Sequence, residues 1–186
     1  MRALEEAGLG YRMLQESDTE MGGVKTFADA QKCANLFKAH REEIMGILVV
    51  LPNFGDERGI AETISMAGLD VPVLVQAYPD DLDKLDVARR RDAWCGKISV
   101  CNNLYQYGIK YSLTEQHVIR PDHTDFVQEV KDFAAVCRVV RGLKGMRIGA
   151  VGARPGGFNT VRYSEKILQR NGITVVTVDL SEILGQ

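Results

Sequence analysis

The chain of 186 residues is 45% hydrophobic and 26% charged, with 18 glycines and 5 prolines, a composition that is typical of a folded globular protein and excludes a disordered one. Its formal net charge of −2 supplies no electrostatic footprint for DNA or RNA, and the triplet Arg89-Arg90-Arg91 is more typical of a solvated helix than of a contact patch. No run approaches the roughly 18 apolar residues of a membrane span and the first ten residues hold no signal-peptide core, so the sequence predicts a cytoplasmic protein that binds neither nucleic acid nor membranes.

Short β-branched runs alternate with longer segments of helical spacing along the whole chain. In chain order the pattern predicts helix 1–7, strand 11–14, helix 26–41, strand 46–52, helix 58–67, strand 71–76, helix 86–107, weaker extended pieces 110–113 and 117–119, helix 125–140, strand 146–151, helix 160–170, strand 173–178 and a last short helix capped by Ser181. Thr26 is the expected cap of the second helix, and Gly68 the expected end of the third.

This alternation predicts an α/β fold, because helices between strands connect them in parallel through right-handed crossovers. We expect a three-layer αβα sandwich with a parallel sheet, Rossmann-like or flavodoxin-like, followed by the start of a second similar domain. The expected boundary lies at residues 142–145, which gives a first domain at 1–142 and a second at 143–186. Since the chain begins inside a helix and stops just after strand 173–178, we expect the first domain to lack its first strand and the second to be truncated.

The nucleophilic and titratable side chains form no catalytic or metal-binding pattern. The cysteines make neither a CxxC pair nor a zinc spacing and are expected to be small apolar core residues: Cys33, Cys95, Cys101 and Cys137. The histidines, His40, His117 and His123, have no paired spacing. The sequence therefore offers no candidate catalytic residue and no metal ligand.

The loops that leave the carboxyl ends of the strands are the best places for a ligand, because such loops converge with helix N-termini at one edge of a parallel sheet. Three loops qualify, at residues 52–57, 76–80 and 152–159. In the third, Gly152 and Gly156 enclose three residues rather than the four of a Walker loop, no lysine follows, and the dinucleotide spacing GxGxxG fails as well. Nucleotide binding is therefore disfavoured.

The same third loop presents an aromatic ring, an amide and cations. Phe158, Asn159 and Arg162 stand at the start of the predicted helix, with Arg154 earlier in the loop. Such a set suits a neutral polyol or an anionic sugar, which stacks on the ring and bonds to the amide. The alternative interpretation is that the glycines only end the strand and that Asn159 only caps the helix.

A second polar cluster lies late in the helix predicted at 86–107. It consists of Asn102, Asn103, Tyr105 and Gln106. Adjacent amides are poor helix formers, so another constraint is expected to have selected them. A substrate site and a structural amide network both explain the cluster.

Three stretches carry a family resemblance: GILVVLPNFGDE at 46–57, CGKISVCNNLYQYGI at 95–109 and RIGAVGARPGGFNTVRYSEKIL at 147–168. Together they resemble the N-terminal part of L-fucose isomerase-like proteins, relatives of the L-fucose and L-arabinose ketol isomerases, over residues 19–184. The resemblance implies Rossmann-like sandwiches followed by a carboxy-terminal domain. It also implies conversion of an aldose to a ketose through an enediol, assisted by Mn²⁺ whose two acidic ligands and one histidine come from a later part of the chain.

The resemblance further implies a homo-oligomer in which amino-terminal loops of one subunit close the sugar site of another. By region, Asn53, Phe54 and the segment 102–106 match the parts that reach a neighbour's substrate, and the loop 154–162 matches the substrate-side loop of the second sandwich. Arg154 and Arg162 would tolerate an anionic group on the sugar.

The sequence thus predicts the N-terminal fragment of a sugar isomerase, which contributes substrate-contacting and oligomer surfaces, binds no metal itself and is inactive alone. Two alternatives stay open. One is a non-catalytic module that holds a sugar or another small ligand between two sandwiches. The other is a purely structural oligomerisation domain.

Overall fold

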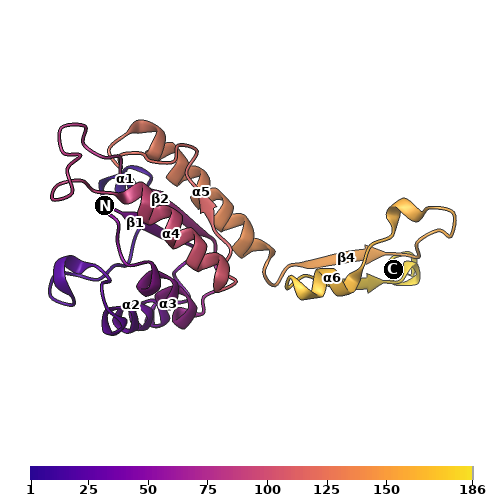
Figure 1. Ribbon diagram of the computed structural model, residues 1–186. Helices are drawn as coiled ribbons and strands as arrows, with labels where there is room; N and C mark the ends of the chain where they lie inside the picture. Colours follow the sequence, from indigo (N-terminus) through magenta and orange to yellow (C-terminus); the bar gives the residue numbers. More distant parts are fainter. Residues whose placement is uncertain (186) are drawn as a thin grey trace. The chain divides into compact units, whose positions relative to one another are not determined.

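The computed structural model describes residues 1–185, which form two compact units, Met1–Cys137 and the segment from Arg138 onward (Figure 1). Within these residues, no helix combines the length and the apolar character that crossing a membrane requires. The first unit contains α1 (Arg2–Glu6), the 3-10 helix η1 (Glu20–Gly22), α2 (Phe27–Ala39), β1 (Ile47–Leu51), α3 (Glu57–Ala67), β2 (Val73–Ala77), α4 (Ala93–Gln106), β3 (Ser112–Leu113) and most of α5 (Thr124–Leu143).

The first unit is built on a parallel sheet in the order β1-β2-β3. The register of β1 and β2 runs from Ile47 opposite Val73 to Leu51 opposite Ala77. β3 pairs with β2 over two positions, Ser112 with Leu74 and Leu113 with Val75. The predicted α/β class with parallel strands is confirmed, whereas the three-layer Rossmann-like sandwich stays a prediction.

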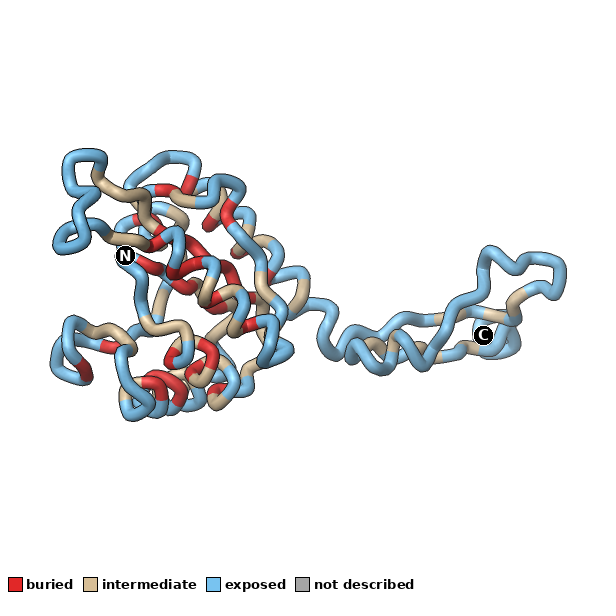
Figure 2. The backbone as a smooth tube through the Cα atoms, viewed as in Figure 1, coloured by how far each residue is buried: buried red, intermediate tan, exposed pale blue. Residues whose placement is uncertain are grey.

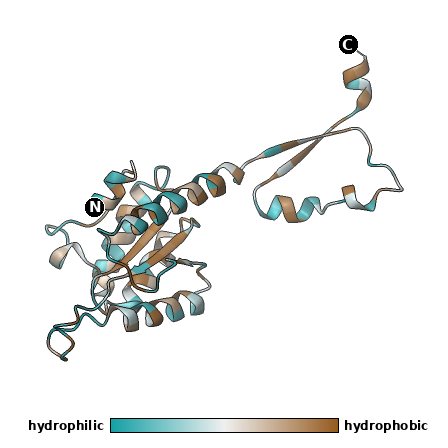
Figure 3. Cartoon of the chain, turned by 90° about the horizontal axis from the view of Figure 1, so that it is seen from above, coloured by the Kyte–Doolittle hydropathy of each residue, from teal (hydrophilic) through white to brown (hydrophobic). Residues whose placement is uncertain are grey.

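Two clusters of buried apolar residues pack around this sheet; Figure 2 colours buried residues red, and Figure 3 colours hydrophobic residues brown. One cluster joins the strands to α3 and α4, and comprises Ile47, Val49, Leu51, Ala61, Val73, Val75, Ala77, Ala93, Val100 and Leu104. The other joins α1 and α5 through Ala3, Ile119, Phe126 and Val130, with Leu48 of β1 packed against it. Burial on both faces explains the apolar run of β2, whose five positions are all buried, whereas in β1 Leu48 is half-buried and Val50 is exposed.

A capping box fixes the start of α2, as the sequence predicts for Thr26. Thr26 Oγ1 accepts a hydrogen bond from Asp29 N (3.2 Å), and Asp29 Oδ2 accepts one from Thr26 N (3.0 Å). The hydrogen bond with Thr26 is the largest cause that lowers the pKa of Asp29.

Thr26→Ala removes this cap and is therefore expected to lower the free energy of unfolding by about 1 kcal/mol in urea denaturation. Ser65→Ala, an exposed position inside α3, is the control and is expected to change it by less than about 0.5 kcal/mol; equal effects of the two changes would contradict the assignment.

The helix predicted at 86–107 is wrong in its first turns, since α4 begins at Ala93. Asp92 has a left-handed backbone (φ 56°), which interrupts helical geometry immediately before that residue. Asp80 Oδ1 accepts hydrogen bonds from the backbone N–H groups of Arg91 (2.8 Å) and Asp92 (3.0 Å) and so holds them outside the helix. The triplet Arg89-Arg90-Arg91 therefore lies in a loop and not in a helix.

Two predicted strands are also wrong, because a strand needs a neighbour to bond with. Residues 11–14 form no ladder, although Leu14 is buried. Residues 117–119 form no strand, although Ile119 N donates a backbone hydrogen bond to Ala77 O (2.9 Å) at the end of β2. The piece predicted at 110–113 is a strand only at Ser112–Leu113.

The second unit is a β-α-β arrangement of β4 (Arg147–Val151), the 3-10 helix η2 (Asn159–Val161), α6 (Glu165–Arg170), β5 (Thr174–Val178) and α7 (Leu180–Leu184). β4 and β5 pair in parallel, as predicted. The helix predicted at 160–170 is split, because Ser164 caps α6 by accepting from Ile167 N. Asp179, and not Ser181, caps α7.

The cysteines divide between the core and the surface. Cys33 and Cys137 are buried, Cys101 is half-buried and Cys95 is exposed. Burial raises the pKa of the Cys33 thiol to about 11, as expected for an inert core residue. The predicted core role is therefore wrong for Cys95.

Candidate functional site

The carboxyl ends of β1, β2 and β3 are followed by three loops of the first unit, at residues 52–56, 78–92 and 114–123. Because α4 runs from this edge of the sheet back to the start of β3, its first turn lies at the same edge. Ligand sites of open parallel sheets form at this edge. We therefore take it as the candidate site.

The loop after β1 is seated on the first turn of α4. A Cβ added to Gly96 would lie 2.0 Å from Phe54 O and 2.7 Å from Phe54 Cα, so only glycine permits this approach. Within the loop, Asn53 Oδ1 accepts a hydrogen bond from Gly55 N (3.1 Å). The Phe54 side chain is 40% exposed at this edge of the sheet.

Arg91 ties the loops after β1 and β2 together. Its Nη1 donates to Pro52 O (3.2 Å), its Nη2 lies 3.5 Å from Asp81 Oδ2, and its guanidinium carbon stands 5.3 Å from the centre of the Tyr78 ring. The buried Nε of Arg91 has no hydrogen-bond partner among the described residues. These contacts give Arg91 a structural role in joining two loops of the site.

An exposed pair of rings lies at the start of α4. The ring centroids of Trp94 and His117 are 4.6 Å apart, with their planes tilted by 38°. Trp94 is 40% exposed, and His117 is exposed as well. The pair brings the first turn of α4 into contact with the loop that follows β3.

Beneath this pair lies a buried lysine. Lys97 is 1% exposed, and its Nζ donates to Thr114 Oγ1 (2.9 Å) and to the backbone oxygen of His117 (3.0 Å). Thr114 Oγ1 in turn donates to Gln116 O (2.7 Å). Burial lowers the pKa of Lys97. The ammonium group thus fixes the loop that carries His117.

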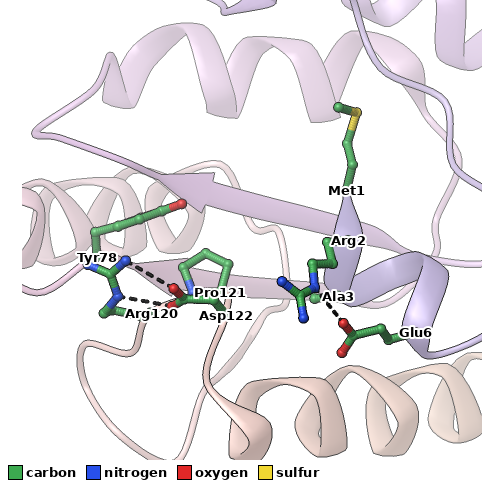
Figure 4. Close-up of a pocket in the computed structure, with 8 residues that line it drawn as sticks. All are labelled: Met1, Arg2, Ala3, Glu6, Tyr78, Arg120, Pro121 and Asp122. Carbon is green, nitrogen blue, oxygen red and sulfur yellow. Dashed lines mark hydrogen bonds and ion pairs between the residues drawn. The ribbon is translucent and has the colours of Figure 1, made fainter.

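A pocket of ≈ 240 Å³ lies between α1, Tyr78 and residues 120–122 (Figure 4). Its charged groups are paired within short segments. Arg120 bonds both oxygens of Asp122 (2.9 and 3.0 Å), and Arg2 Nε bonds Glu6 Oε1 (2.6 Å), as the dashed lines in Figure 4 mark. The pocket therefore offers compensated charges rather than a surplus of one sign.

The polar cluster predicted late in α4 is not brought together with Asn53 and Phe54. Tyr105 is eleven residues beyond Trp94, about 16 Å along the helix axis, and is 78% exposed. Asn103 Nδ2 donates to Ser99 O (3.3 Å) inside the helix. Asn102 and Gln106 are exposed. A substrate role for these four residues stays a prediction, and Asn103 already has a structural one.

In the second unit, Arg154 is held by its own neighbours. Its Nη2 donates to Tyr163 Oη (2.7 Å) and lies 3.0 Å from Glu165 Oε1, and its guanidinium carbon stands 4.1 Å from the centre of the Tyr163 ring. The hydrogen bond with Glu165 is the largest cause that raises the pKa of Arg154. Its charge is therefore compensated within the unit.

The other predicted residues of this loop are exposed and lie near Arg154. Phe158 is 61% exposed, and Arg162 Nη2 makes a long hydrogen bond to Pro155 O (3.5 Å). Asn159 begins η2 and does not cap α6. The proposed capping role of Asn159 is wrong, and its role toward a sugar is still a prediction.

The described residues do not offer a site for the Mn²⁺ that the resemblance implies. In residues 1–185, no three His, Cys, Asp or Glu side chains are grouped as metal ligands would be. His123 Nδ1 accepts a hydrogen bond from Asp125 N (3.2 Å), and His40 Nδ1 lies 3.4 Å from Glu43 Oε1. His123 therefore makes a local contact at the start of α5, whereas His40 Nδ1 also accepts a hydrogen bond from Arg12 Nε (3.3 Å).

Comparison with known proteins settles the family. The family model of the fucose/sulfoquinovose isomerase N-terminal domain matches residues 1–144. The chain belongs to this family. The prediction from the three sequence stretches is thereby confirmed at the level of the family, and a comparison with curated proteins gives no match. The stretch at 147–168 lies beyond the matched residues, so its correspondence to a substrate-side loop stays a prediction.

Four residues of this isomerase-family domain escaped sequence reasoning: Trp94, Gly96, Lys97 and His117. Three of them lie in the stretch RDAWCGK at the start of α4, where the predicted longer helix concealed a helix N-terminus. The available signal was the single tryptophan of the chain, which lies two residues before a glycine. His117 lies in a polar loop, and its position beside Trp94 could not be seen from spacing.

Proposed function

We propose that this chain acts as the N-terminal part of an aldose-ketose isomerase for sugars of the fucose and sulfoquinovose class, and that it supplies walls of the sugar site. The family match over residues 1–144 carries this proposal. The exposed rings of Phe54, Trp94 and His117 at the carboxyl edge of the sheet support it. Aromatic rings with a few polar groups are what a sugar requires from a binding surface.

The proposed roles are binding and enclosure rather than proton transfer. Interconversion of an aldose and a ketose moves a proton between two adjacent carbons through an enediol, and Mn²⁺ would polarise the two sugar oxygens that change. We assign the metal ligands and the proton-transferring carboxylates to a part of the protein outside residues 1–185. As part of the same proposal, the chain folds as a cytoplasmic Rossmann-like sandwich, forms homo-oligomers, and lends its Asn53 and Phe54 loop to a neighbour's sugar.

The class of sugar is a finer proposal, and it concerns charge. Sulfoquinovose carries a sulfonate, so a cation facing the sugar would favour it over fucose. Glu165 compensates the charge of Arg154, whereas Arg162 has a long bond to a carbonyl and an exposed side chain. Of the two arginines, Arg162 is therefore the better candidate for an anionic substituent.

The proposal is tested by sugar binding and turnover with the 186-residue chain. L-Fucose and sulfoquinovose are each expected to raise its Tm, because a ligand at about ten times Kd stabilises the folded state by about 1.4 kcal/mol. Proton NMR of either sugar with Mn²⁺ is expected to show no ketose formed by the chain alone. Glycerol is the control for a general cosolvent effect.

Failure of both sugars to raise Tm beyond glycerol would contradict the proposed sugar site. Ketose formation by the chain alone would contradict the assignment of the chemistry to another part of the protein. Stabilisation by sugars in the absence of any isomerase activity of the complete gene product would favour the non-catalytic binding module.

A further inference from the structure

Two aromatic rings, Trp94 at the start of α4 and His117 in the loop after β3, are in contact at a tilt of 38° and yet exposed. Trp94 and His117 come from different elements, with ring centroids 4.6 Å apart. A ring pair formed only for stability would gain more by burial, because burial of apolar area is the main stabilising term. The exposed surface of this pair therefore points to a ligand.

The pair is held by an arrangement that is costly in free energy. Lys97 is almost fully buried, and desolvation of an ammonium group is unfavourable unless its protons find acceptors. Both of its acceptors, Thr114 Oγ1 and His117 O, belong to the loop after β3. Lys97 lies one turn of α4 beyond Trp94, so a single helix turn holds one ring and anchors the other.

A third ring, that of Phe54, belongs to the same edge of the sheet. Phe54, itself 40% exposed, has its backbone in contact with Gly96, two residues after Trp94. The first turn of α4 is thus the common support of Phe54, Trp94 and His117. The rings carry no formal charge when His117 is neutral, and they suit the apolar C–H face of a polyhydroxylated ring.

We propose that Trp94 and His117 form a stacking platform for the C–H face of a sugar, and that Lys97 is the positioning residue that holds this platform. The inference rests on the proposed function, since it takes the ligand class from the isomerase family. It goes beyond that function in two ways. It assigns a sugar contact to Trp94 and His117, which lie outside the stretch around Asn53 and Phe54, and it assigns a positioning role to the buried Lys97.

The single tryptophan makes the platform directly observable. L-Fucose and sulfoquinovose are titrated separately into the full chain while Trp94 emission is recorded, and saturation-transfer NMR detects which sugar protons contact protein. We expect a saturable change in emission and saturation of C–H protons on one face of the sugar. Trp94→Leu and His117→Leu are each expected to raise Kd, measured by calorimetry, by about 3- to 10-fold.

Phe27→Leu provides the matched control, because Phe27 is an aromatic residue with 52% exposure at the start of α2. It is expected to leave Kd unchanged. If the wild-type chain binds sugar and the Trp94 and His117 variants bind equally well, the platform is overturned while the proposed function stands. If the wild-type chain binds neither sugar, both are overturned.

The role of Lys97 is separated from general stability by its partner Thr114. Thr114→Ser keeps the hydroxyl that accepts from Lys97, whereas Thr114→Val keeps the shape and removes the acceptor. We expect Thr114→Val to shift the emission of Trp94 in the absence of sugar and to raise Kd for the sugar about 3-fold or more. Thr114→Ser is expected to keep the emission and the Kd of the wild type. Equal Kd and emission in the two variants, at temperatures where both are folded, would overturn the positioning role.

Discussion

Gly96→Ala is expected to lower the free energy of unfolding by about 2–3 kcal/mol, an overpacking penalty, and to displace the loop that carries Phe54. The added Cβ would stand 2.0 Å from Phe54 O and 2.7 Å from Phe54 C, both backbone atoms that cannot turn away as a flexible side chain could. The usual gain of about 1 kcal/mol from replacing glycine with alanine in a helix is too small to offset this clash.

Gly142→Ala is the matched control for that change. Gly142 also lies in a helix, α5, but a Cβ there would meet no atom within 4 Å. The substitution is expected to raise the free energy of unfolding by up to about 0.5–1 kcal/mol. Urea denaturation of both variants checks the opposite signs, and a Gly96→Ala protein as stable as the wild type would show that Phe54 is not seated on α4.

The two long strands of the first unit could be predicted from the sequence because nearly all of their residues are apolar. All five positions of β2 and three of the five in β1 are buried, and such runs can be recognised without any knowledge of partners. The helix start at Thr26 and the helix end at Gly68 were predictable for a similar reason, since caps act within a few residues.

The start of α4 could not be predicted, because it depends on a contact between loops. Asp80 bonds the backbone of Arg91 and Asp92, eleven and twelve residues later, and this contact overrides a sequence with acceptable helix propensity. The strand predicted at 11–14 failed for a related reason, since pairing needs a neighbour that local pattern does not reveal.

In the candidate site, too, local sequence pattern could be read from the sequence and tertiary contacts could not. Phe54 was named as a candidate because it lies in the loop after a predicted strand, within a stretch that resembles the isomerase family. Trp94 and His117 were missed because the contacts that unite them, Lys97 with Thr114 and with His117, span 17 and 20 residues. Sequence reasoning pointed to the loops at this edge of the sheet, but the side chains that face each other across it are set by the tertiary fold.

Lys97→Ala is expected to lower the free energy of unfolding by about 2–5 kcal/mol, as other large-to-small changes in a core do. Its side chain is 1% exposed, so truncation leaves a cavity beside α4 and two acceptors without their donor. Lys97→Met is the matched control, because methionine fills the space of the lysine stem without its charge. It is expected to remain within about 1.5 kcal/mol of the wild type at neutral pH.

Comparison of the wild type with Lys97→Met isolates the charge through its pH dependence. Burial lowers the pKa of folded Lys97 below its ordinary value of 10.5, with Cys101 and Glu129 acting weakly in the opposite direction. Between the folded pKa and 10.5, the unfolded chain therefore binds the extra proton, and stability contributed by this residue rises with pH. Below the folded pKa the penalty for the buried charge is fully present.

The wild type is thus expected to gain free energy of unfolding relative to Lys97→Met as the pH rises through this alkaline window. Urea denaturation of both proteins from neutral pH to about pH 10.5 measures the difference, in which titrations shared by the two proteins largely cancel. A wild type that loses stability relative to Lys97→Met over the same range would mean that the ammonium form is favoured by folding. The hydrogen bonds to Thr114 and His117 would then outweigh the desolvation penalty of the ammonium group. The charge of Lys97 would stabilise the fold, and it would not be a destabilising charge whose role is to position His117.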